Sequence, residues 1–127
     1  MKPRLGLIGY GAFGRLTARH LSLWFDIIAH DPAAEEGEGT VVLTDLATAA
    51  ACRVVILAVP VEALAETCDA ISTHLTPDAL VLDVGSVKVL PSRVMTERLP
   101  AGISLVGLHP LFGPQSAKDG VAGHRIA

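Results

Sequence analysis

A histidine between an apolar run and a rigid loop has the setting that points most directly to chemistry. His109 follows the apolar segment 103–108, and residues 110–114 read Pro-Leu-Phe-Gly-Pro. The apolar run predicts a buried strand, and the prolines and glycine restrict the chain that follows it. A neutral imidazole titrates near neutral pH, so it can accept a proton from an alcohol. We therefore interpret His109 as a candidate general base.

A glycine-rich turn near the N-terminus has the pattern that binds dinucleotide phosphates. Residues 9–14 read Gly-Tyr-Gly-Ala-Phe-Gly and lie between an apolar strand pattern and an amphipathic helix pattern. In that context the first glycine permits a tight turn, the second lets the backbone approach a pyrophosphate, and the third lets helix and strand pack closely. The amides at the helix N-terminus would then face the phosphates. The candidate cofactor-binding residues of this turn are Gly9, Tyr10, Gly11, Ala12, Phe13 and Gly14.

An acidic residue follows at the end of the next predicted strand. Asp31 is placed about 20 residues beyond the glycine-rich turn, where a carboxylate can accept hydrogen bonds from an adenosine ribose. It would also repel a 2′-phosphate, and no Arg or Lys occurs between Arg19 and Arg53 to offset that charge. This favours NAD over NADP. The alternative is a loop aspartate that caps the following turn, because Asp-Pro often begins turns.

Two further strand ends carry candidate site residues. Val59 and Pro60 leave the strongest predicted strand and begin a helix, so we expect packing together with a backbone-mediated cofactor contact. Ser86 stands at the cap position of the turn 83–88. A serine there needs no role beyond capping. The same hydroxyl could also bond to a substrate or to the imidazole of His109.

Predicted strands and helices alternate along the chain. We predict strands at 5–8, 26–30, 40–43, 53–59, 79–84 and 103–108, and helices at 12–24, 45–51, 61–75 and 88–99. This alternation predicts parallel βαβ units and therefore a doubly wound, mostly parallel α/β sheet of the Rossmann type. Ligands of such sheets bind at the carboxyl ends of the strands. All the motifs above lie at such ends, so we expect them to converge on one edge.

The amino-acid composition narrows the class of protein to which this chain can belong. A chain of 127 residues fits one domain, with a core supplied by 50% hydrophobic residues. A formal charge of −3 without a basic stripe does not favour nucleic-acid binding, and no apolar run approaches the roughly 20 residues that cross a bilayer. Cys52 and Cys68 lack the spacing of a metal or redox motif, so no metal is predicted. Without a signal peptide, we expect reduced thiols in a cytoplasmic protein.

Taken together, the motifs at 9–14, 58–60, 83–88 and 109–114 resemble those of the prephenate/arogenate dehydrogenase family, the oxidoreductases of tyrosine biosynthesis. The first two motifs occur in many nicotinamide enzymes, whereas the last two together are more specific. The resemblance implies NAD(P)-dependent oxidation and decarboxylation of prephenate or arogenate. It also implies that His109 takes the proton of the ring hydroxyl as hydride leaves the same carbon. Ser86 would orient His109 and contact that hydroxyl.

The resemblance also implies parts that this sequence does not contain. Family members continue the sheet and add a helical domain that dimerises and supplies arginines to the substrate. We therefore expect residues 1–127 to be a dinucleotide-binding domain truncated at its C-terminal edge, and to associate as a homo-oligomer or with a partner through that edge. Two alternatives stay open. One is a non-catalytic dinucleotide-binding module that needs a partner chain; the other is a β-hydroxyacid dehydrogenase or imine reductase, which shares the glycine-rich turn.

Overall fold

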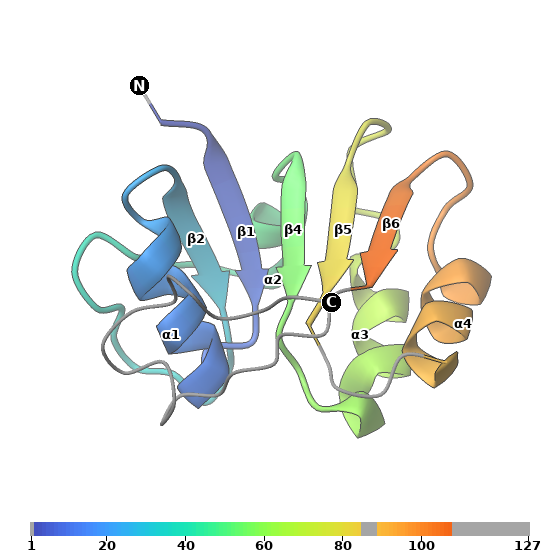
Figure 1. Ribbon diagram of the computed structural model, residues 1–127, viewed down its shortest axis with the longest axis horizontal. Helices are drawn as coiled ribbons and strands as arrows, with labels where there is room; N and C mark the ends of the chain where they lie inside the picture. The colour runs from blue at the N-terminus through green and yellow to red at the C-terminus, as the bar shows by residue number, and fades with distance from the viewer. Residues whose placement is uncertain (1, 85–88, 108–127) are drawn as a thin grey trace, which may run out of the picture.

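The computed structural model describes residues 2–84 and 89–107, which form a six-stranded sheet with helices on both faces (Figure 1). The strands are β1 (Arg4–Ile8), β2 (Asp26–His30), β3 (Val42–Leu43), β4 (Val54–Leu57), β5 (Leu80–Asp83) and β6 (Ser104–Gly107). Their order is β3-β2-β1-β4-β5-β6, and every pairing is parallel. The prediction of a doubly wound parallel sheet is confirmed.

The central strands are buried on both faces because helices cover both. Along β1, Leu7 packs with α1 (Ala12–Leu21), whereas its neighbour Ile8 joins the core on the opposite face. That second core is built from the buried residues of α2 (Leu46–Ala50), α3 (Val61–Ile71) and α4 (Val89–Arg98). Figure 1 shows α1 in front of the sheet and α2 behind it. Successive strand side chains point to opposite faces, which explains the nearly continuous apolar runs in the sequence.

Two helices are shorter than predicted. We expected the first to run to Trp24, but α1 ends at Leu21 and Ser22 caps it. Trp24 therefore lies beyond the helix, where it is 62% exposed. The physical reason is that the backbone N–H of Asp26 donates to the carbonyl oxygen of Pro3 at the start of β2. The chain therefore has to leave the helix and turn back toward the sheet before residue 26. Likewise α3 ends at Ile71 rather than at residue 75.

All strands point the same way, so the loops that follow β1, β2 and β4 lie at one edge of the sheet (Figure 1). The loops that precede the strands lie at the opposite edge. Among the described residues, no helix is long and apolar enough to cross a membrane. The fold thus brings the glycine-rich turn, Asp31 and Val59 together at the edge where the sequence predicted a site.

Candidate functional site

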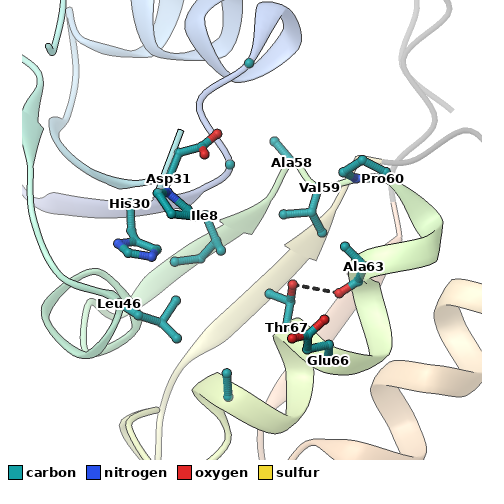
Figure 2. A pocket seen from close by; sticks show the side chains of 14 residues that line it. Ile8, His30, Asp31, Leu46, Ala58, Val59, Pro60, Ala63, Glu66 and Thr67 are labelled. Atoms are coloured by element: carbon teal, nitrogen blue, oxygen red, sulfur yellow. Dashed lines mark hydrogen bonds between the residues drawn. The ribbon is translucent and has the colours of Figure 1, made fainter. Parts of the chain in front are cut away.

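A pocket of about 410 Å³ opens at the carboxyl ends of β1, β2 and β4. Figure 2 shows Asp31 and His30 on one side, Ala58, Val59 and Pro60 at the end of β4, and α3 on the other side. Its lining includes five of the residues that the sequence predicted to bind a cofactor, namely Gly9, Gly11, Asp31, Val59 and Pro60. Residues far apart in sequence therefore meet in one cavity.

The three glycines of the turn have three different structural roles. Gly9 has φ +102, and a Cβ there would lie 2.4 Å from the carbonyl oxygen of Ala58. A Cβ on Gly14 would lie 2.3 Å from the carbonyl oxygen of Gly9, so this glycine lets α1 approach β1. A Cβ on Gly11 would meet nothing within 4 Å, although Gly11 lines the pocket. Gly11 thus leaves open space beside the N-terminus of α1, the position where a phosphate would bind.

The carboxylate of Asp31 organises the glycine-rich turn. Its Oδ2 accepts a hydrogen bond from the backbone N–H of Tyr10 at 2.8 Å, and its Oδ1 accepts one from the backbone N–H of Ala33 at 2.9 Å. The second bond is the turn-capping contact that the sequence left as an alternative. Each carboxylate oxygen has two acceptor sites, so both can still receive a ribose hydroxyl. Asp31 is therefore both a structural residue and a lining residue of the pocket.

The wall formed by α3 is one that the sequence did not identify. Ala63, Thr67 and Ala70 line the pocket at helical spacing, and the hydroxyl of Thr67 donates to the carbonyl oxygen of Ala63 at 2.7 Å (Figure 2). With its hydroxyl satisfied, Thr67 presents its methyl group on a wall of small side chains. Leu46 faces this wall from α2. The recurrence of small residues at positions 63, 67 and 70 was the available signal. The resulting slot suits a flat apolar group such as a purine base.

Not every residue of the glycine-rich turn faces the pocket. The side chain of Tyr10 is only 2% exposed and packs in the core beside α1, although its backbone N–H binds Asp31. Ala12 and Phe13 lie in the first turn of α1 and are not among the lining residues. None of Tyr10, Ala12 and Phe13 lines the pocket, and the cofactor contact expected of each stays a prediction.

The pocket is acidic. Two of its lining residues, Asp31 and Glu66, carry carboxylates, and none of the lining residues is a lysine or an arginine. A ribose with free hydroxyls can donate hydrogen bonds to such a site, whereas a 2′-phosphate would meet like charge. The preference for NAD inferred from Asp31 stays a prediction.

His109 and Ser86 lie outside the described residues. The strands that lead to them are described: β5 ends at Asp83 and β6 at Gly107, and these two residues are register partners in adjacent parallel strands. The described ends of β5 and β6 therefore lie side by side, at the same edge of the sheet as the pocket.

Comparisons with known proteins show what the chain is similar to. Residues 29–125 match the family described as "Prephenate dehydrogenase, nucleotide-binding domain". A probable arogenate/prephenate dehydrogenase of Methanocaldococcus jannaschii is 32% identical over 63 residues, which are 50% of this chain and 14% of that protein.

Two solved structures share the fold. Prephenate dehydrogenase of Aquifex aeolicus, in complex with hydroxyphenyl propionate and NAD⁺, is 26% identical with a TM-score of 0.62, covering 87% of this chain and 42% of that chain. The 3-hydroxyisobutyrate dehydrogenase of Mycobacterium tuberculosis has a TM-score of 0.78 at 21% identity, covering 94% of this chain and 44% of that one. The latter likeness concerns the fold alone. The chain spans less than half the length of each of these relatives.

Proposed function

This chain belongs to the prephenate dehydrogenase nucleotide-binding domain family, and from that premise we propose that it binds NAD as part of an NAD-dependent prephenate or arogenate dehydrogenase of tyrosine biosynthesis. The observation that carries the proposal is the pocket itself. It combines open space at Gly11 beside a helix N-terminus with the carboxylate of Asp31. The complex of the A. aeolicus relative with NAD⁺ supports the same cofactor.

The chain's own residues would divide the binding of the dinucleotide. Gly11 and the first amides of α1 would hold the pyrophosphate, since the N-cap residue is a glycine without a side chain to occupy that place. Asp31 would accept hydrogen bonds from the adenosine ribose. Leu46, Ala63 and Thr67 would enclose the adenine between α2 and α3. The nicotinamide end would then extend along the sheet edge toward the ends of β5 and β6.

His109 and Ser86 are proposed to act at that end. Bound NAD supplies the acceptor for the hydride that leaves the carbinol carbon of the cyclohexadienyl ring. The imidazole of His109 would take the hydroxyl proton as the C–O bond becomes a ketone. The ring carboxylate would then leave as carbon dioxide, and the electron pair of the broken C–C bond would enter the ring and convert the ketone to an aromatic phenolate. His109 would return its proton to the phenolate oxygen. Ser86 would hold the hydroxyl and the imidazole in line.

The test measures binding and turnover separately. We expect the chain to bind NAD by isothermal titration calorimetry, and to reduce it in the presence of prephenate or arogenate. His109→Asn should lower turnover about 10²–10⁴-fold without weakening NAD binding, because it removes a general base. His74→Asn, a matched change at an exposed histidine, should leave both unchanged.

The possible outcomes separate the two functions that the sequence left open. Binding without turnover by the unaltered chain would favour the non-catalytic module. Failure to bind either NAD or NADP would refute the proposed function. A solution mass above that of a monomer would support the predicted association.

A further inference from the structure

A second cluster of charged and aromatic side chains joins α1 to the loop that follows Asp31. The carboxylate of Glu38 accepts hydrogen bonds from Arg15 Nη1 and Arg19 Nε, both at 3.1 Å. The guanidinium carbon of Arg15 lies 4.3 Å from the centre of the Tyr10 ring. The backbone N–H of Glu38 donates to the Tyr10 hydroxyl at 2.9 Å. All the members of this cluster therefore hold one another in place.

The cluster is directly connected to the ribose-binding carboxylate. Tyr10 binds Asp31 through its backbone N–H and Glu38 through its hydroxyl. Tyr10, which is buried, therefore forms a hydrogen bond with each end of the loop from residue 31 to residue 38. Tyr10 therefore connects Glu38 to the carboxylate proposed to bind the ribose.

The charges of the cluster bear on the choice between NAD and NADP. A 2′-phosphate adds about two negative charges at neutral pH, and arginine is the side chain best suited to bind it. The lining of the pocket provides no cation, but α1 carries two on the side that faces this loop, Arg15 and Arg19. Both are engaged by Glu38.

We propose that Glu38 is a specificity-determining residue, which holds Arg15 and Arg19 on the loop and so denies them to a ribose 2′-phosphate. The inference rests on the proposed function, since it concerns the same dinucleotide. Glu38 neutralises one of the two positive charges and fixes the direction of both guanidinium groups. Asp31 is then the charge that the ribose meets.

The ionisation of Glu38 agrees with this role. The hydrogen bond from Arg19 is the largest influence on its pKa, followed among the favourable contacts by that from Arg15, and together they lower the pKa of Glu38 below its ordinary value. Glu38 is therefore ionised at neutral pH, when the cofactor would bind. The two ion pairs are partly exposed, with Arg15, Arg19 and Glu38 side chains 31%, 58% and 43% accessible, so a phosphate can compete for the arginines once Glu38 is neutral.

The experiment uses two probes that differ only at the ribose. ADP-ribose and 2′-phospho-ADP-ribose are titrated into the chain by calorimetry, and the ratio of their dissociation constants is compared between variants. The unaltered chain should prefer ADP-ribose. Glu38→Gln should lower that preference about fivefold, because it frees two partly exposed arginines for the phosphate. Glu36→Gln removes the same charge from an exposed residue of the same loop, and should change the preference by less than about twofold.

A second variant tests whether the freed Arg15 causes the change in preference. Adding Arg15→Gln to Glu38→Gln should restore part of the lost preference, because the freed cation is then absent. Equal shifts from Glu38→Gln and Glu36→Gln would overturn the inference, since they would show only a general effect of charge. Equal weakening of both probes by Glu38→Gln would also overturn it, because the loop would then have a structural role alone. A chain that binds neither probe would refute the proposed function instead.

Discussion

Replacing Gly14 by alanine should lower stability, whereas replacing Gly11 by alanine should weaken ligand binding, although each change adds one methyl group. At Gly14 a Cβ would lie 2.3 Å from the carbonyl oxygen of Gly9, whereas ordinary contacts begin near 3.4 Å. Helix α1 and the turn must therefore separate by about 1 Å, and overpacking of this kind typically costs about 1–3 kcal/mol. At roughly 4 °C per kcal/mol for a domain of this size, Tm should fall by about 4–12 °C.

Gly11→Ala should weaken ligand binding and leave stability almost unchanged. Nothing lies within 4 Å of a Cβ there, and φ is −80, which alanine adopts without strain. The small loss of preference at the N-cap is offset by the lower entropy of the unfolded chain, so the free energy of unfolding should change by less than about 1 kcal/mol. The methyl group would occupy the phosphate position. We expect ADP-ribose binding to weaken about 100-fold, because displaced phosphate oxygens lose charge-assisted hydrogen bonds to backbone amides.

Scanning calorimetry measures the first effect and isothermal titration the second, on both variants and the unaltered chain. Each variant is the control for the other. Unchanged binding by Gly11→Ala would refute the placement of the pyrophosphate at this turn. An unchanged Tm in Gly14→Ala would refute the close approach of α1 to the strand.

Three other perturbations test separate parts of the structure. Asp31→Ala removes the acceptor of two backbone hydrogen bonds, so we expect a loss of about 1–3 kcal/mol in chemical unfolding and weaker binding of ADP-ribose; unchanged stability would contradict the structural role. Ala63→Leu should fill the slot on α3 and abolish ADP-ribose binding while far-UV circular dichroism stays native; retained affinity would place the base elsewhere. Burial raises the pKa of Cys68 to about 11, so its folded thiol stays protonated where the unfolded thiol ionises. The free energy of unfolding should therefore fall as the pH rises from about 9 toward 11, and Cys68→Ala should remove the part of this fall that Cys68 causes. An equally steep fall in the variant would contradict the assignment of the pH dependence to Cys68.

The local pattern of the sequence was enough to predict the architecture. Continuous apolar runs predicted strands buried on both faces, and β1 and β4 are such strands. The glycine-rich turn between a strand and a helix predicted the position of Gly9, Gly11 and Asp31 at the pocket. These features depend on periodicity and turn chemistry within a few residues, so they can be read without knowing the fold. The ends of α1 and α3 were predicted less well, because tertiary connections decide where a helix stops.

What only the tertiary structure decided is which side chains meet. Asp31 binds the backbone of Tyr10 across 21 positions of sequence, and Glu38 binds the hydroxyl of Tyr10 across 28. The sequence assigned Tyr10 to cofactor binding and gave Glu38 no role, since nothing local distinguishes Glu38 from Glu35 and Glu36. The sequence determined that a dinucleotide turn and an acidic strand end are present. The way in which α1 packs against the loop after β2 decided which charged side chains contact one another, because electrostatic contacts depend on distance in space rather than on separation along the chain.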